Sequence, residues 1–210
     1  MKPVRSRRTR AALGTWLLLA CDAGQAPGAP CPQRMAHLPE VGACIDRYEA
    51  RIVDGRAEPA RGVVPERDVD HATATRACRA AGLRLCTERE WTRACVGPGP
   101  EPRRMPHDDG ITDTRPCNTA TAHDDLSRAA PRPGGAMTRC VTPEGVFDLS
   151  GNVWEWTDGR DDSGTLRELR GGGFANGGSA IECVPEDRFY QPPDARFDGY
   201  GFRCCADARF

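Results

Sequence analysis

Residues 145–159, with the sequence GVFDLSGNVWEWTDG, are the part of this chain of 210 residues that says most about its fold. In the second half of the stretch Trp154 and Trp156 alternate with other residues, which predicts a β-strand with both indoles on one face. Two bulky side chains on one face are typical of core packing, so packing is favoured over a ligand role. The stretch therefore predicts a buried strand that follows a turn at Gly151.

The first half of the same stretch has the composition of a cation site. Asp148 and Glu155 flank the turn at Gly151. A hard cation such as calcium takes about six to eight oxygen ligands, which side chains and carbonyl groups of a tight turn can supply together. The residues alone leave a second interpretation open, in which Asp148 closes an Asx turn and Glu155 pairs with an arginine.

Two helices are indicated upstream. Between Asp70 and Ala81 small apolar residues recur at helical spacing, and Gly82 supplies a stop. Thr87 and Glu90 form a capping box that opens a second helix. Residues 96–135 are rich in Pro, Gly, Asp and Arg and are predicted to be ordered loop. The two His-Asp-Asp triplets of this region, at 107–109 and 123–125, are interpreted as solvated loop charges.

Several blocks together resemble the formylglycine-generating enzyme family, also called the sulfatase-modifying factor domain family. They are residues 145–159, LRGGGF at 169–174, GFRCCAD at 201–207, GLRLCTEREW at 82–91 and, as the first strand, CIDRYEAR from Cys44. Cys86 stands where the family has proline, and Ala50-Arg51 departs from the family's first strand. The resemblance implies an α+β, C-type-lectin-like fold that is rich in loops, stapled by disulfides and spans residues 31–210.

The resemblance also implies where catalysis would occur. Family members place one cysteine two residues after the aromatic residue of the RGG-x-aromatic turn and a second cysteine five residues later. Asn176 and Ile181 occupy these positions. The family's cysteine pair binds copper(I), for which asparagine is a poor ligand and isoleucine is none. The sequence therefore argues against copper and leaves any catalytic residue unknown.

Calcium is implied by the same resemblance. Family members bind it with residues that match Asp148, Gly151, Val153 and Glu155, the middle two through their carbonyl oxygens. A second, weaker family site would begin at Asn118 and Thr119 and would need a carboxylate near Asp124 or Asp125. A structural calcium ion is therefore the expected cofactor.

The N-terminus has the pattern of a bacterial export signal. A basic segment precedes an apolar run that ends at Cys21, and Leu18-Leu19-Ala20-Cys21 resembles a lipobox. We expect a signal peptide at residues 1–20, lipidation of Cys21, a tether at residues 21–30 and attachment to the membrane through the lipid alone. The alternative is an ordinary signal cleaved near Ala20 or Ala23. Either signal exports the domain, and the lipid would make it a periplasm-facing or cell-surface lipoprotein of the bacterial cell envelope.

The cysteines predict a disulfide framework. Of eleven cysteines, ten remain beside Cys21, and an even number in an exported chain favours pairing. We expect Cys31–Cys44 and Cys117–Cys140. The resemblance implies Cys95–Cys183 and a link from Cys78 to the block at 201–205, and Cys86 would take whichever of Cys204 and Cys205 remains.

Charge and sites together define two functional hypotheses. The chain carries 29 basic and 30 acidic side chains, and the signal holds basic residues without acidic ones, so the mature chain is acidic and a nucleic-acid partner is disfavoured. The favoured hypothesis is a non-catalytic or repurposed module that binds a protein, peptide or glycan on a lectin-like scaffold. The alternative is a divergent oxidoreductase of the formylglycine-generating class.

Overall fold

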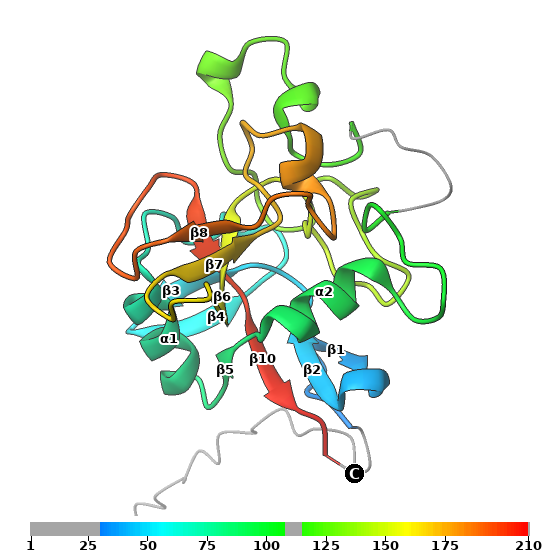
Figure 1. Cartoon of the computed structure of the whole chain (residues 1–210), viewed down its shortest axis with the longest axis vertical. Coiled ribbons are helices and arrows are strands. Elements are labelled where there is room, and N and C mark those ends of the chain that lie inside the picture. Colours follow the sequence, from blue (N-terminus) through cyan, green and yellow to red (C-terminus); the bar gives the residue numbers. More distant parts are fainter. Residues whose placement is uncertain (1–29, 108–114, 210) are drawn as a thin grey trace, which may run out of the picture.

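A computed structural model describes residues 30–107 and 115–209 (Figure 1). The expected signal peptide and Cys21 lie outside these residues. The strands are β1 Met35–Leu38, β2 Ala43–Asp46, β3 Ala50–Val53, β4 Arg56–Pro59, β5 Arg84–Leu85, β6 Trp154–Arg160, β7 Arg167–Arg170, β8 Phe189–Gln191, β9 Tyr200–Phe202 and β10 Cys204–Asp207. The helices are α1 His71–Ala80 and α2 Glu88–Val96, with the short 3-10 helices η1 Pro39–Val41, η2 Ala120–Ala122, η3 Leu126–Arg128 and η4 Gly178–Ile181. The fold is α+β and rich in loops, as expected.

The strands form two four-stranded sheets and one hairpin. The first sheet has the order β1-β2-β10-β5, the second has the order β8-β7-β6-β9, and β3 pairs with β4. In the second sheet β6 and β9 run parallel, whereas the other neighbours are antiparallel. The chain leaves β9 in one sheet and enters β10 in the other across Arg203. Arg203 therefore lies where the two sheets meet.

The two helices begin where the sequence predicts. The Asp70 side chain accepts a hydrogen bond from the backbone N–H of Thr73 and caps α1. At the start of α2 the Thr87 hydroxyl accepts from the N–H of Glu90, and the Glu90 carboxylate accepts from the N–H of Thr87. Each such cap stabilises a helix by about 1 kcal/mol.

The expected first strand is divided in two. The segment CIDRYEAR contributes to β2 and to β3, and residues 47–49 leave the strand between them. Ala43, Ile45 and Ala50 are fully buried, so each piece contributes a core position. The break turns the Glu49 side chain into the interior, where it is 2% exposed. A carboxylate thereby enters the core from a segment whose pattern suggested only a strand.

The prediction for β6 is confirmed. Trp154 is 7% and Trp156 is 1% exposed, and both belong to the apolar cluster that includes Phe202. The Trp156 indole N–H donates to the carbonyl of Val69 at 2.7 Å, so the buried donor is satisfied. A second apolar cluster includes Trp91, Ile45 and Leu149.

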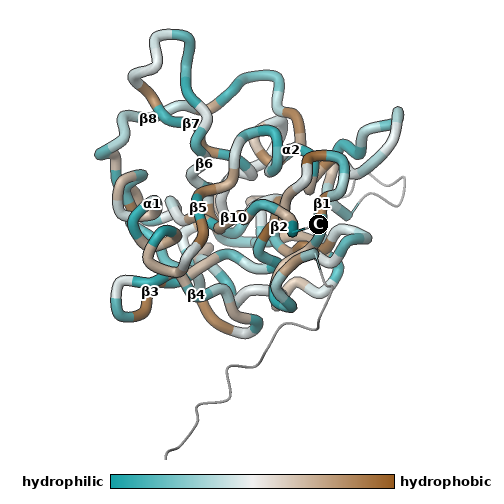
Figure 2. Tube along the Cα trace, turned by 90° about the horizontal axis from the view of Figure 1, so that it is seen from below, coloured by the Kyte–Doolittle hydropathy of each residue, from teal (hydrophilic) through white to brown (hydrophobic). Residues whose placement is uncertain are grey.

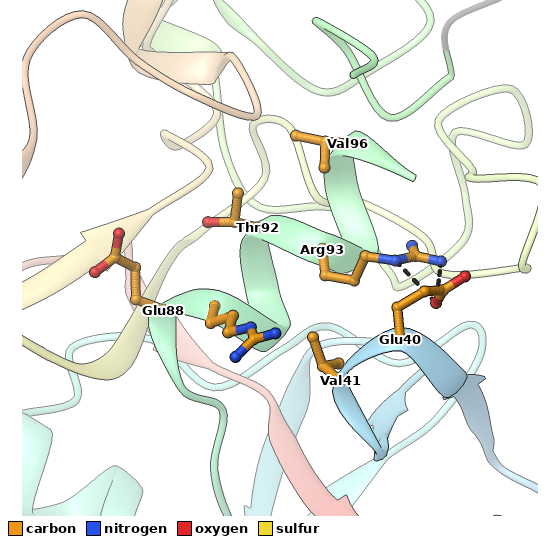
Figure 3. Close-up of a pocket in the computed structure, with 7 residues that line it drawn as sticks. Glu40, Val41, Glu88, Thr92, Arg93 and Val96 are labelled. Carbon is orange, nitrogen blue, oxygen red and sulfur yellow. Dashed lines mark hydrogen bonds and ion pairs between the residues drawn. The ribbon is translucent and has the colours of Figure 1, made fainter. Parts of the chain in front are cut away.

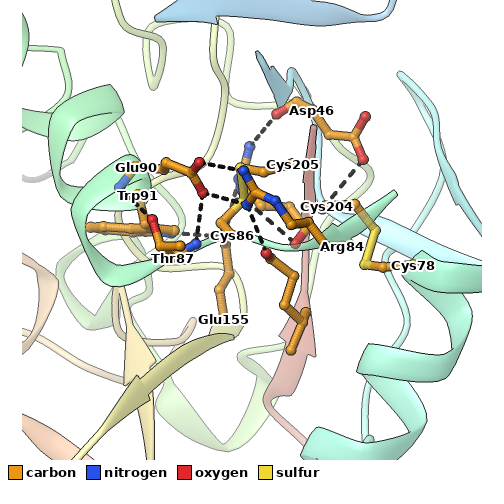
Figure 4. Close-up of a disulfide and its surroundings, with 12 residues drawn as sticks. Asp46, Cys78, Arg84, Cys86, Thr87, Glu90, Trp91, Glu155, Cys204 and Cys205 are labelled. Atoms are coloured by element: carbon orange, nitrogen blue, oxygen red, sulfur yellow. Dashed lines mark hydrogen bonds and ion pairs between the residues drawn. A yellow bond between two sulfur atoms is a disulfide. The ribbon is translucent and has the colours of Figure 1, made fainter. Parts of the chain in front are cut away.

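Five disulfides pair the ten cysteines of the described residues: Cys31–Cys44, Cys78–Cys204, Cys86–Cys205, Cys95–Cys183 and Cys117–Cys140. They agree with the expected pairings and assign the two partners that the sequence left open. Neighbouring residues of a strand point to opposite faces, so Cys204 reaches α1 while Cys205 reaches Cys86 after β5 (Figure 4). Such a framework suits an oxidising compartment.

The described chain begins and ends at one pole of the molecule. The N–H of Arg209 donates to the carbonyl of Pro30 at 3.0 Å. The 3-10 helices η2, η3 and η4 lie at the opposite pole (Figure 1). Apolar residues occur in short runs along the trace (Figure 2), and within the described ranges no helix has the length and hydrophobicity needed to cross a membrane.

Candidate functional site

Asn176 lines a pocket at the place where the family's first catalytic cysteine is expected. The pocket measures about 250 Å³ and is formed by β6, β7, η4 and the segment that leads into β8. Its lining consists of Trp154, Leu169, Arg170, Gly171, Asn176, Ser179, Ala180, Pro185, Asp187, Arg188 and Phe189. Residues from three separated segments of the sequence therefore share this pocket.

The amide of Asn176 is held in one orientation. Its Oδ1 accepts hydrogen bonds from the indole N–H of Trp154 and from the backbone N–H of Gly173, each at 2.9 Å. Because both partners are donors, they must face the oxygen, and the Nδ2 amino group takes the other end of the amide. The Asn176 carbonyl also accepts from the N–H of Ala120 at 2.8 Å, which ties the loop before η2 to the pocket.

Ile181 is a core residue. Its side chain is fully buried, and a Cβ added to Gly172 would lie 2.7 Å from its Cγ2. Its carbonyl accepts from the Ser150 hydroxyl at 2.5 Å. The second family position is thus filled by packing and lies outside the set of residues that line the pocket.

Aromatic rings form one wall of the pocket. Trp154 and Phe189 are stacked, with centroids 4.4 Å apart and planes inclined by 25°. Two rings outside the pocket lining extend this aromatic group. The ring centroids of Tyr200 and Phe189 are 6.4 Å apart in an edge-on arrangement, and the centroid of Phe197, which is 59% exposed, lies 5.5 Å from that of Tyr200. Offset stacks of this kind are worth about 0.5–1.5 kcal/mol beyond the burial of their area.

The arginines at the pocket are already paired. Arg170 is 3% exposed, contacts Glu168 at 3.3 Å and stacks over the Trp91 ring. Arg188 contacts Glu88 at 2.5 Å and Glu168 at 3.6 Å. Burial raises the pKa of Glu168, against the opposing effect of Arg170. The positive charges here therefore hold the protein together and are not free for an anionic ligand.

Glu155 and Arg203 form a buried pair at the junction of the two sheets. Both side chains are 1% exposed, and the guanidinium donates to both carboxylate oxygens at 2.6 Å. Glu155 also accepts from the indole N–H of Trp91 at 2.8 Å. Arg203 further donates to the carbonyls of Asp46 and Phe147. The pairing of Glu155 with an arginine, one of the two interpretations of the sequence, is thus present.

Two more carboxylates lie in this junction. Asp148 accepts from the backbone N–H of Gly135 at 2.7 Å. Glu49, which the sequence analysis did not single out, accepts from the N–H of Val153 at 3.1 Å and from the Asn152 amide. Its buried position could be found in the sequence only if the break of the first strand were known.

The junction carries an excess of negative charge. Burial raises the pKa of Asp148 to about 6, and burial together with the charges of Asp148 and Glu155 raises the pKa of Glu49 well above its usual value. Arg203 compensates one of these three carboxylates. A divalent cation would compensate the remaining negative charge, whereas both oxygens of Glu155 already accept from Arg203 and one of them also accepts from Trp91.

The turn of this motif is shaped for close contacts. Asp148 and Asn152 have φ values of 60° and 59°, a left-handed conformation that Asp and Asn tolerate better than most residues. Gly151 has φ 77°, and a Cβ there would overlap the carbonyl of Asn118. Glycine is therefore required at position 151 by both its backbone angle and its neighbour.

The residues of the second calcium motif have other partners. The Asn118 Oδ1 contacts His123 Nε2 at 2.8 Å, and its Nδ2 donates to the carbonyl of Ala130 and to Asn152. Thr119 is fully buried and contacts the Thr121 hydroxyl. Asp125 caps η3 by accepting from Ser127 and pairs with Arg128. Within the described ranges no contact joins Asp125 to Asn118, so these residues do not fit a shared cation.

A third set of metal-ligand types has no free thiol. His107, Cys117 and Cys140 have ligand atoms within 4.8 Å of one another. Both sulfur atoms belong to one disulfide, which makes them unable to act as thiolate ligands. The set is a disulfide beside a histidine.

A larger and more open pocket lies between η1 and α2 (Figure 3). It measures about 480 Å³ and is lined by Glu40, Val41, Glu88, Arg89, Thr92, Arg93 and Val96. Arg93 contacts Glu40 at 2.6 Å across one edge of it. The residues that the sequence singled out as catalytic or calcium-binding are not part of this lining.

Comparison with known proteins identifies the family of this chain. The model of the sulfatase-modifying factor enzyme 1-like domain matches residues 40–208, and the chain belongs to this family. A protein of Bos taurus, "Inactive C-alpha-formylglycine-generating enzyme 2", is 27% identical over an alignment of 157 residues that covers 62% of this chain and 46% of the relative. The Mus musculus protein of the same name is 37% identical over an alignment of 73 residues that covers 30% of this chain and 22% of the relative. The chain thus spans less than half of either relative.

Solved structures show the same fold. "Treponema denticola variable protein 1" superposes with a TM-score of 0.56 at 17% identity and covers 85% of this chain and 93% of its own. PvdO from Pseudomonas aeruginosa has a TM-score of 0.56 at 18% identity, with 78% of this chain and 79% of PvdO covered. CarF has a TM-score of 0.57 at 16% identity, with 79% of this chain and 86% of CarF covered. At these identities the likeness concerns the fold alone.

Proposed function

We propose that this protein is a non-catalytic binding module of the sulfatase-modifying factor family, exported to the cell envelope. The observation that carries the proposal is the state of the two family cysteine positions. The amide oxygen of Asn176 accepts hydrogen bonds from Trp154 and Gly173, and the Ile181 side chain is buried in the core. The ten cysteines of the described residues are all in disulfides, so they supply no thiolate for copper. Relatives named as inactive support the same reading.

The shape of the molecule suits display from a lipid anchor. The described chain starts at Pro30 beside Arg209, the last described residue, and η4, which contributes to the pocket, lies toward the other pole (Figure 1). A tether at residues 21–30 that ends in a lipidated Cys21 would hold the first pole toward the membrane. The pocket around Asn176 would then face away from the bilayer, where a soluble or surface-bound ligand could reach it.

We assign the cation of the first motif to a structural role. Asp148 and Glu155 would hold calcium through their carboxylates, and Gly151 and Val153 would hold it through their carbonyl oxygens. The ion would supply positive charge to a junction in which three carboxylates face one arginine. This role needs no part in a reaction.

A direct assay tests the non-catalytic proposal. The purified mature domain is incubated with copper(I), dioxygen and a peptide containing Cys-x-Pro-x-Arg, and the peptide mass is measured for conversion of cysteine to formylglycine. An active member of the family run in parallel is the positive control. We expect no conversion and no stoichiometric copper. Conversion, or one copper ion bound per chain, would replace the proposal with the divergent oxidoreductase.

A further inference from the structure

We infer that the pocket around Asn176 binds one neutral sugar unit of a glycan, an inference that rests on the proposed function and names its ligand class. It is carried by three properties of the lining: polar groups that remain available for hydrogen bonds, a stacked pair of aromatic rings, and arginines whose charge is compensated.

The polar groups that remain available come from two segments, the residues around η4 and the residues that lead into β8. Asn176 Oδ1 is used twice, so the Nδ2 amino group has two N–H donors to offer. Ser179 and Asp187 also line the pocket, and among the described residues neither side chain has a hydrogen-bond or ion-pair partner. Together these groups supply both donors and acceptors. A hydroxyl group needs both, because it donates one hydrogen and accepts through its oxygen.

Two aromatic side chains, Trp154 and Phe189, line the same pocket as these polar groups. Phe189 is partly exposed and stacks on Trp154, whose indole N–H is held by Asn176. The C–H face of a pyranose ring is apolar and packs on aromatic rings, while its hydroxyl groups project from the edge. The wall and the segment with Asn176 match these two parts of a sugar.

The charge and the volume of the pocket further restrict the class of ligand that it can bind. Arg188 and Arg170 are matched by Glu88 and Glu168, and Asp187 adds one negative charge. An anionic ligand would meet this excess, whereas a neutral one would not. The volume of about 250 Å³ is below the roughly 300–1,000 Å³ of pockets for drug-sized ligands and fits a single ring.

The test is a titration of the 15N-labelled mature domain followed by the indole N–H signals of its tryptophans. The probes are maltotriose and chitotriose as neutral glycans, an oligogalacturonate of the same length as an acidic glycan, and an uncharged hexapeptide. We expect a neutral glycan to shift the Trp154 signal, while Trp156, which donates to Val69, stays in place.

The key variant is Asn176→Asp. It keeps an oxygen to accept from Trp154 and Gly173 but removes both N–H donors, so the Trp154 signal should report an intact pocket while neutral-glycan affinity falls at least tenfold. Ser179→Ala should weaken binding several-fold. Asp54→Asn, in the exposed turn between β3 and β4, is the matched control and should bind like the wild type.

Each other result overturns the sugar assignment. If neither neutral glycan shifts Trp154 at the highest soluble concentration, or if Asn176→Asp binds as well as the wild type, the assignment is wrong. Binding of the acidic glycan or of the peptide in preference to the neutral glycans also rejects it but keeps the binding module. Formylglycine formation in the separate peptide assay would reject the module itself, so the two failures are distinct.

Discussion

Arg203 lies between the two sheets and donates to both carboxylate oxygens of Glu155 at 2.6 Å, with each side chain 1% exposed. Because Arg203 is the residue at which the chain passes from β9 to β10, this pair fixes the relative position of the sheets. Breaking a buried pair by removing one partner leaves an uncompensated charge in the core.

We therefore expect Arg203→Met to lower the free energy of unfolding by about 3–5 kcal/mol. Glu49, Asp148 and Glu155 would then share the junction without the arginine, so Arg203→Met combined with Glu155→Gln should be more stable than Arg203→Met alone. Urea denaturation followed by tryptophan fluorescence measures both. Arg76→Met, on the exposed side of α1, is the control and should stay within about 0.5 kcal/mol of the wild type. A double variant less stable than Arg203→Met would contradict this account.

Calcium should raise the melting temperature of the mature domain, since a ligand bound only by the folded state stabilises it by mass action. Asp148→Asn and Glu155→Gln should each abolish the shift. Asp125→Asn should retain it, because Asp125 caps η3 and pairs with Arg128. Differential scanning calorimetry with calcium and with EDTA gives the comparison. A wild-type melting temperature that is the same in both solutions would rule out the site.

Stability should depend on pH through Asp46. Burial raises the pKa of this carboxyl from 3.8 to about 7, against the opposing effect of Arg34. The folded state then holds a proton that the unfolded chain has lost, so the stability linked to Asp46 is full below about pH 4 and is lost as the pH rises toward 7.

Asp46→Asn should flatten this decline, because the amide cannot ionise. The measurement is urea denaturation at a series of pH values in EDTA, which keeps calcium from acting on the other carboxylates. Asp161→Asn is the control: hydrogen bonds from Ser163 lower the pKa of this exposed carboxyl, so its titration lies below the window. An unchanged slope for Asp46→Asn would show that Asp46 is ionised in the folded state.

The disulfides should differ in their contribution to the free energy of unfolding according to the length of the loop that each one closes. Cys78–Cys204 closes 126 residues and Cys31–Cys44 closes 13. Chain entropy predicts a loss of about 4–5 kcal/mol when the first pair is replaced by alanines and about 3 kcal/mol for the second. Urea denaturation of the two double variants tests the order. The reverse order would mean that effects in the folded state outweigh those in the unfolded chain.

Membrane attachment should depend on Cys21. A Cys21→Ser variant should move from the membrane fraction to the soluble envelope fraction, because the lipid is the proposed anchor. Fractionation with immunodetection measures the distribution, and Cys31→Ser controls for loss of a different cysteine. A Cys21→Ser variant that remains with the membrane would reject the lipoprotein proposal.

The sequence alone determined both helices, the strand at Trp154 and the disulfides Cys31–Cys44 and Cys117–Cys140, because these depend on local spacing. The family and the Cys95–Cys183 disulfide followed from the resemblance of several blocks along the chain. The capping box of Thr87 and Glu90 is such a case, since its four atoms belong to one turn. The replacement of the two family cysteines by Asn176 and Ile181 could likewise be identified from the sequence.

Only the tertiary structure showed which contacts these residues make. The hydrogen bond from Trp154 to Asn176 joins residues 22 positions apart in the sequence. The Glu155–Arg203 pair joins residues 48 positions apart, and Glu49 accepts from Val153, 104 positions away. The choice between Cys204 and Cys205 depended on which face of β10 meets α1. These relationships arise when two sheets pack against each other and bury charged groups, and the cost of burial selects partners that no local pattern in the sequence can specify.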